Sequence, residues 1–161
     1  MKEFTVFMDE GSIDMDIINA FEDKIGFCLP KSYKKLSSQH NQLSLVQDTF
    51  DFVNVYGEKD ERDVSFFGYG NLKHEKIEDN LRISDPLYYG IPNFVAFARC
   101  ANGDMICFDY RDDPKGCNPR VVLVYHDDYI TQEDGTIQMV VNVVANSFEE
   151  FMDMLYEYKD E

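Results

Sequence analysis

Histidine and cysteine side chains are the first candidates for chemistry in this chain, because they supply nucleophiles, bases and metal ligands near neutral pH. The candidates are His40, His74, His126, Cys28, Cys100, Cys107 and Cys117. No histidine has a neighbour that marks a catalytic pair, and the sequence lacks GxSxG, Walker and GxGxxG motifs. A Cys–His hydrolase pair assembled only by folding stays open as the least favoured alternative.

Two metal sites can be drawn from the sequence, and neither has the spacing that such sites use. A zinc set would combine Cys100, Cys107, Cys117 and His126, separated by six, nine and eight residues rather than by knuckle spacings. A calcium set would combine Asp104, Asp109, Asp112 and Asp113, without the central glycine and final glutamate of an EF-hand. Ordinary strand and turn residues explain both groups, so the sequence predicts no metal and no cofactor.

The cysteines also bear on the cellular compartment. They form no CxxC motif, and a chain of 161 residues needs no disulfides to build a core. We therefore expect reduced thiols in a cytoplasmic protein. The N-terminal residues contain no apolar run of signal-peptide length, and no segment approaches the roughly 20 apolar residues of a membrane span.

Net charge is the most unusual property of the sequence. There are 31 Asp and Glu against 15 Lys and Arg, which gives a formal charge of −16. Such a chain repels phosphate backbones and anionic membranes, so direct binding to either is disfavoured. A basic protein would be attracted and steered toward it. Solubility alone is the competing explanation of the acidity.

Hydrophobic spacing predicts two helices near the N-terminus and one near the C-terminus. Isoleucine and phenylalanine recur every four residues from Ile13 to Ile25, with Ser12 as the expected cap and Gly26 as the stop. Pro30 is expected to open the second helix. Ser147 with a glutamate three residues later forms a capping box for the last helix. A further short helix is expected over 72–81.

The remaining segments are typical of an antiparallel sheet. Strands are expected at 4–8, 50–55, 94–98, 105–108, 121–125 and 137–144. Asn102-Gly103-Asp104 predicts a hairpin turn, whereas 58–63 and 127–135 are expected to be exposed loops. The sequence thus predicts one α+β domain over residues 1–161, a single mostly antiparallel sheet with flanking helices, with an N-terminal helix pair and a C-terminal helix.

Acidic segments that also hold tyrosines are the best candidates for a binding surface. Tyrosine is a favoured interface anchor, and carboxylates suit an interface with a strongly basic partner. The candidate partner-binding residues are Asp109, Asp112, Asp113, Asp127, Asp128, Tyr129, Glu133 and Asp134, with Glu58, Asp60, Glu61 and Asp63 as a second patch. The alternative for each residue is a solvated loop without a partner.

Four ordered segments resemble the SUKH superfamily, whose name-giving members are the Smi/Knr-type regulators of fungal cell-wall synthesis. They are Glu22-x3-Gly26-x2-Leu29-Pro30-x2-Tyr33, Ile91-Pro92 with the strand after it, Gly103-Asp104 with Phe108-Asp109, and Val144 to Phe151. The segments run from about Ile13 to Leu155. The stretch from Leu43 to Tyr89 matches poorly, and Asn41 is followed by Gln42 where the family often has glycine.

The resemblance implies one sheet with flanking helices and a role as a bacterial immunity protein that neutralises a polymorphic or contact-dependent toxin. Many such toxins are nucleases, whose basic clefts would meet competing carboxylates on this chain. The family offers no catalytic residues to transfer, so we expect a binding protein rather than an enzyme. A regulatory scaffold that binds a host protein is the alternative, and the oligomeric state is left open.

Overall fold

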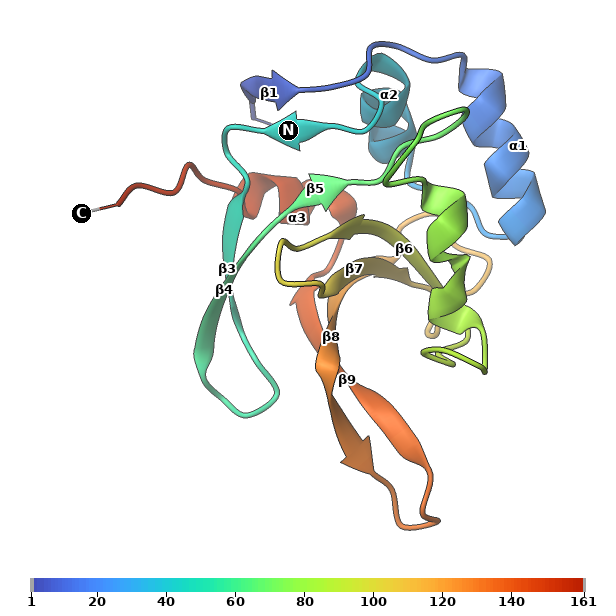
Figure 1. Ribbon diagram of the computed structural model, residues 1–161, viewed down its shortest axis with the longest axis vertical. Helices are drawn as coiled ribbons and strands as arrows, with labels where there is room; N and C mark the ends of the chain where they lie inside the picture. Colours follow the sequence, from blue (N-terminus) through green and yellow to red (C-terminus); the bar gives the residue numbers. More distant parts are fainter. Residues whose placement is uncertain (1, 161) are drawn as a thin grey trace.

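The structure is a computed structural model that describes residues 2–160 of the chain. Its elements follow in the order β1 (Val6–Met8), α1 (Met15–Ile25), α2 (Lys31–Gln39), β2 (Ser44–Leu45), β3 (Thr49–Val53), β4 (Lys59–Asp63), β5 (Ser65–Phe66), the 3-10 helix η1 (Ile77–Ser84), β6 (Phe94–Arg99), β7 (Met105–Asp109), β8 (Arg120–Thr131), β9 (Ile137–Ala145) and α3 (Phe148–Met154). The α+β class predicted from the sequence is confirmed (Figure 1).

The main sheet has five antiparallel strands in the order β5-β6-β7-β8-β9. Two further two-stranded ribbons, β1-β2 and β3-β4, accompany it, so the strands are not gathered into one sheet as expected. Figure 1 shows α1, α2 and α3 gathered at the upper end of the molecule, with the β3-β4 and β8-β9 hairpins pointing away from them. These two hairpins project furthest from the helices.

An aromatic cluster joins the helices to the sheet. The buried ring of Tyr33 on α2 meets Phe97, Phe108 and Phe148 edge-on, at centroid distances of 5.6, 5.1 and 5.4 Å. Phe97 and Phe108, on neighbouring strands, stack at 4.1 Å. Each such pair adds about 0.5–1.5 kcal/mol beyond the area it buries. This packing fixes α2 and the start of α3 against the central strands β6 and β7.

Local signals set the helix ends. Asp14, not the expected Ser12, caps α1 by accepting a hydrogen bond from the backbone N–H of Asp16. Gly26 ends the helix at φ 75°, a conformation that glycine adopts without steric cost. Ser147 caps α3 as predicted. No helix within residues 2–160 is long and apolar enough to span a bilayer.

Three segments differ from their sequence-based expectations. Residues 59–63, expected as a turn, form β4. Backbone hydrogen bonds to the more apolar strand β3 stabilise this strand, although its charged sequence does not predict one. Residues 127–131, expected as loop, continue β8 beyond an irregularity in its pairing. The short helix expected over 72–81 begins later and is a 3-10 helix.

The prediction that all four cysteines are reduced thiols is wrong. Cys28, between α1 and α2, and Cys117, between β7 and β8, form a disulfide with a Cα–Cα distance of 4.8 Å. The two residues lie 89 positions apart, so only the tertiary fold brings them together. Cys100 and Cys107 are free and buried. The disulfide ties the 111–119 loop to the helix pair.

Replacing both Cys28 and Cys117 by alanine is expected to lower the free energy of unfolding by about 2–4 kcal/mol, because the bond closes a long loop in the unfolded chain. Urea unfolding with and without a reducing agent measures the effect. The reducing agent should destabilise the unmodified protein by a similar amount and leave the double variant unchanged. Equal stability of all samples would show that the bond constrains nothing.

Candidate partner-binding surface

The outer part of the β8-β9 hairpin, residues 127–141, is called the distal hairpin below. Val124 pairs with Val141 and Tyr129 pairs with Met139, so five steps along β8 face two steps along β9. The three extra residues form a bulge that contains His126, Asp127 and Asp128. Bulges twist a strand and re-aim its side chains, and they are frequent at functional sites. The distal hairpin therefore leaves the main sheet in a direction of its own (Figure 1).

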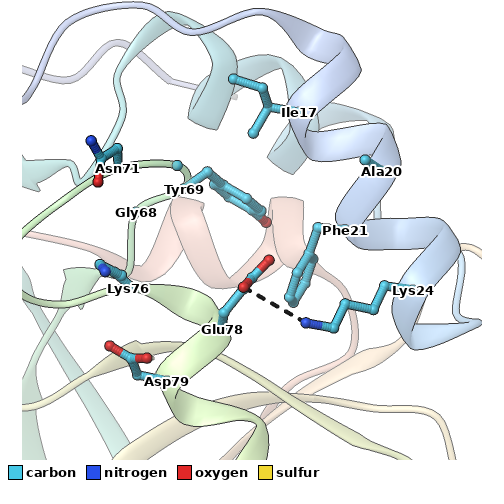
Figure 2. Close-up of a pocket in the computed structure, with 11 residues that line it drawn as sticks. Ile17, Ala20, Phe21, Lys24, Gly68, Tyr69, Asn71, Lys76, Glu78 and Asp79 are labelled. Carbon is cyan, nitrogen blue, oxygen red and sulfur yellow. Dashed lines mark ion pairs between the residues drawn. The ribbon is translucent and has the colours of Figure 1, made fainter.

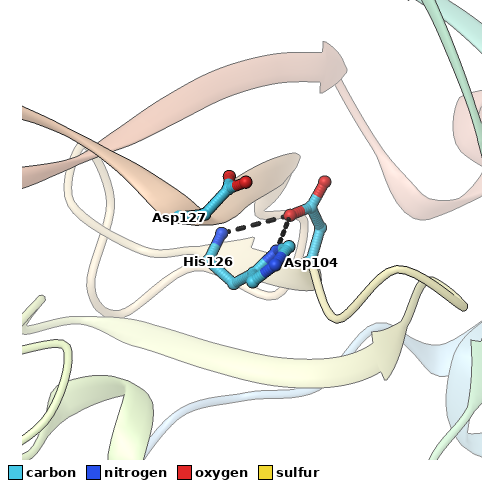
Figure 3. A group of neighbouring side chains, drawn as sticks. All are labelled: Asp104, His126 and Asp127. Atoms are coloured by element: carbon cyan, nitrogen blue, oxygen red, sulfur yellow. Dashed lines mark hydrogen bonds and ion pairs between the residues drawn. The ribbon is translucent and has the colours of Figure 1, made fainter.

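Asp104, in the turn between β6 and β7, fixes this bulge. Its Oδ1 atom accepts hydrogen bonds from the His126 backbone N–H at 3.1 Å, and it lies 2.6 Å from His126 Nδ1 (Figure 3). Its Oδ2 atom accepts from Arg62 and Asn102 at 2.9 and 3.0 Å. Burial alone would raise the pKa of Asp104, but these hydrogen bonds hold it below its ordinary value of 3.8. Asp104 is therefore a charged, structural residue.

The same network ties the β3-β4 hairpin to the main sheet. Arg62 on β4 donates to Asp104 and Asp60, and its guanidinium lies 5.5 Å from the ring centre of Tyr125. The hydroxyl of Tyr125 donates to Asp60 at 2.9 Å. Buried or half-buried carboxylates thus have cationic partners, as low-dielectric surroundings require. The network holds the two hairpins in a fixed relative position.

Asp104, His126 and Asp127 also have the spacing of a metal site, since one ligand atom from each lies within 4.8 Å of the others (Figure 3). Both oxygens of Asp104 already accept two hydrogen bonds each, from Arg62, Asn102 and His126. A cation there would also lie close to the Arg62 guanidinium. The trio is explained by its hydrogen bonds, as an anchor of the bulge.

The carboxylates predicted as one acidic surface divide into two groups. Asp109 is 4% exposed and is ion-paired with Arg111 and Arg120 at 2.9 and 2.8 Å, so it cannot meet a partner. Asp112 and Asp113 follow it in the loop held by the disulfide. Asp109 pairs with Arg120 whereas Met105 pairs with Val124, so this loop lies at the end of β7 opposite the distal hairpin, roughly 13 Å away or more.

The second predicted patch lies beside the distal hairpin. The hydroxyl of Tyr56, in the β3-β4 turn, donates to Asp128 at 2.6 Å, and the Val55 N–H donates to Asn142 on β9. Glu58 and Glu61 are exposed there, whereas Asp60 is engaged with Arg62 and Asp63 accepts from the Ala101 N–H. The structure therefore places the β3-β4 turn, where this β4 patch begins, beside Asp128, whereas Glu133 and Asp134 lie in the turn at the far end of the distal hairpin.

The distal hairpin has no cationic residue of its own. From Val121 to Tyr158 the sequence contains no Lys or Arg, and it contains eight Asp and Glu. Asp127, Glu133 and Asp134 are exposed, and within the described chain neither Asp127 nor Glu133 has a cationic partner. Four of the eight carboxylates lie on the distal hairpin, which carries no cationic side chain of its own, and the other four lie on or next to α3.

Exposed apolar side chains accompany these carboxylates. Tyr129, Ile130 and Ile137 on the hairpin are 56, 52 and 64% exposed, and Tyr56 is 57% exposed. Sequence reasoning identified only Tyr129 among them. Ile137 begins the apolar run of an expected strand, whereas Ile130 lies in a segment expected as a polar loop, and the projection of the hairpin leaves both in solvent. Apolar anchors surrounded by charge are characteristic of protein interfaces.

A different hollow, of about 590 Å³, lies between α1 and residues 68–79, away from the distal hairpin. Figure 2 shows Phe21 and Tyr69 in this hollow, with Lys24 paired to Glu78 at 3.6 Å across it. The Tyr69 hydroxyl is buried against that of Tyr33 at 2.7 Å, and burial raises its pKa. The hollow contains no pair of groups arranged as nucleophile and base.

The cysteines and histidines do not assemble the hydrolase pair left open above. Burial raises the pKa of the Cys100 and Cys107 thiols, so they stay protonated at neutral pH. Cys28 and Cys117 are consumed by the disulfide. In the described part of the chain, His40 bonds to Asp9 and His126 to Asp104, and neither histidine bonds to a thiol. No arrangement for thiolate chemistry results.

Taken together, the fold and the surface define an α+β domain whose most distinctive exposed feature is an acidic, partly apolar hairpin suited to contacts with another protein. A family model described as SMI1 / KNR4 family (SUKH-1) matches residues 13–154. The chain belongs to this family, as the resemblance in the sequence predicted. No curated protein sequence matches it.

Proposed function

We propose that this chain is an immunity protein that binds a cationic toxin, a nuclease by preference, and covers its phosphate-binding surface with the distal hairpin and the neighbouring β4 patch. The family is compatible with such a role. The observation that carries the proposal is the segment from Val121 to Ala145, which has four carboxylates and no Lys or Arg. Its hairpin presents Asp127, Glu133 and Asp134 in solvent.

Electrostatics supply the mechanism of inhibition. A nuclease cleft is positively charged because it holds phosphates. An array of carboxylates imitates the negative charge of those phosphates and therefore complements the cleft. Complementary charge accelerates encounter, and exposed aromatic and aliphatic side chains between the charges provide the area that slows dissociation. The Asp104–Arg62 network keeps the array in one arrangement before contact, which lowers the entropic cost of binding.

Co-expression with a cationic nuclease domain, taken from a toxin gene if one lies beside this gene, tests the proposal. The unmodified protein should protect cells and suppress the nuclease activity of the purified domain. The double variant Asp127→Asn/Glu133→Gln should bind about tenfold more weakly, because both side chains, one in the bulge and one in the turn, are exposed and have no cationic partner. The variant Asp112→Asn/Asp113→Asn changes the net charge equally at the other end and should bind as the unmodified protein does.

If both variants protect cells as well as the unmodified protein does, the distal hairpin is not part of the interface. A neighbouring gene product without affinity for the protein, together with affinity for a host protein, would favour the regulatory-scaffold alternative. The two outcomes are separated by assaying binding directly, by calorimetry, before any growth assay.

A further inference from the structure

Strand β9 is an edge strand that lacks the usual protection of sheet edges. It is the last strand in the order of the five-stranded sheet, with β8 on one side only. Proteins normally guard such an edge with charged residues or proline, because its free N–H and C=O groups can pair with another chain. The nine residues from Ile137 to Ala145 include no charged residue and no proline.

The unguarded part is the outer half of the strand, residues 137–141. Near its inner end, Asn142 accepts the Val55 N–H, so the β3-β4 turn lies against that part of β9. In the described chain, no backbone group of residues 137–141 bonds to any strand other than β8. Figure 1 shows the β8-β9 hairpin reaching beyond the other labelled elements, and Val140 within this stretch is 1% exposed.

One face of this edge is apolar and becomes exposed toward the turn. Ile137 is 64% exposed, whereas Met139 and Val141, which alternate with it on the same face, are half-buried and pack against the hydrophobic core. Tyr129 and Thr131 on β8 pair with Met139 and Ile137, so they widen the same face. An incoming strand would gain backbone hydrogen bonds from the edge and apolar contact from this face.

Charge decides which strand would fit. Asp127 and Asp128 lie in the bulge of β8, one strand in from the edge, Glu133 and Asp134 lie in the adjoining turn, and the hairpin has no Lys or Arg. A second copy of this chain would bring an equal set of carboxylates against these, and like charges facing each other cost several kcal/mol. A strand that carries lysine or arginine would instead neutralise them.

We infer that residues 137–141 of β9 accept a basic β-strand of the partner, which extends the five-stranded sheet by one strand. The inference rests on the proposed function, because it specifies how the cationic partner is held. The partner's basic side chains then lie over Asp127, Asp128 and the turn, and its apolar side chains over Ile137 and Met139.

A synthetic peptide isolates strand addition from recognition of a whole toxin. The probe is a peptide of alternating lysine and valine, equal in length to the nine residues of β9. The matched control carries N-methyl groups on its central residues, so it keeps the charge and loses the backbone donors. We expect the probe to bind at least tenfold more tightly than the control and to slow amide hydrogen exchange at residues 137–141.

Two protein variants complete the experiment. Ile137→Lys places a charge on the edge strand, whereas Thr131→Lys places the same charge on β8, directly opposite in the same pair. The first is expected to weaken peptide binding clearly more than the second, and circular dichroism confirms that both fold. Equal affinity for the two peptides, or protection away from 137–141, overturns the inference, as does a dimer paired through β9 in sedimentation analysis.

These results also separate the inference from the proposal on which it rests. A toxin domain that binds in a charge-dependent way, without protecting β9 amides, leaves the immunity function intact and refutes strand addition. If the protein binds the peptide along β9 but binds no cationic toxin, strand addition is supported and the immunity function is refuted.

Discussion

Replacing Asp104 by alanine is expected to lower the free energy of unfolding by about 3 kcal/mol, because it leaves the part-buried Arg62 guanidinium with Asp60 as its remaining carboxylate partner. Asp104 is 1% exposed and satisfies four donors, two of them on His126. Its loss also frees the bulge, so binding to a cationic partner should weaken although Asp104 touches no partner. Urea unfolding followed by calorimetry measures both effects.

Two further variants test the cause. Asp104→Asn keeps the shape and an acceptor oxygen, so it should recover part of the stability. Asp127→Ala removes a neighbouring but exposed carboxylate, and its unfolding free energy should stay within about 0.5 kcal/mol of the unmodified protein. If Asp104→Ala were as stable as Asp127→Ala, the proposed anchor of the bulge would be wrong.

The pH dependence of stability follows from the same residue. The pKa of Asp104 is lower in the folded protein than its ordinary value of 3.8, so the unfolded chain binds its proton first as pH falls. The stability contributed by this group is fully present above pH 4 and is lost as pH falls through the folded-state pKa. Asp104→Asn should therefore flatten the stability curve below pH 4, with a remaining slope from Asp9, Asp60 and Asp109, whose pKa values are also lowered.

Reversing Asp127, Asp128, Glu133 and Asp134 to lysine is expected to slow association with the cationic toxin by about 100-fold at low salt. Each reversal adds two charges, so the formal net charge rises from −16 to −8. Repulsion replaces steering at the point of first contact. Stopped-flow association rates over a series of salt concentrations measure the effect, and the difference should shrink as salt screens the charges.

The control has the same net charge in another place. Reversal of Glu3, Glu10, Asp16 and Asp23 also gives −8, and all four side chains are exposed on or before α1. This variant should associate within a few-fold of the unmodified rate. Equal slowing in both variants would show that net charge alone steers the partner and that the distal hairpin has no special role.

Features encoded by neighbouring residues could be predicted from the sequence. The 94–109 hairpin follows from Asn102-Gly103-Asp104 between apolar strands, and the start of α3 from the Ser147 capping box. Features made by distant segments could not. β4 is a strand only because β3 lies beside it, and the disulfide needs two loops that fold together.

The candidate surface shows the same division. Composition and the acidic runs pointed to Asp127, Asp128, Glu133 and Asp134, whereas proximity in sequence wrongly grouped Asp109 with them. Asp109 ends an apolar strand and is buried between two arginines, which only the pairing of β7 with β8 reveals. Tyr56 was missed because its proximity to Asp128 spans 72 positions of the chain.

The bulge in β8 has a consequence for how the protein can change. Its three extra residues absorb the mismatch in length between β8 and β9. The pairing of 129–131 with 137–139 is therefore set independently of the pairing of 121–124 with 141–145 in the main sheet. Residues 129–139 can therefore be exchanged for a hairpin of another length or sequence while the aromatic cluster around Tyr33 keeps its packing. A lineage could acquire a new specificity by recombining this short cassette, and an engineer could transplant it between scaffolds.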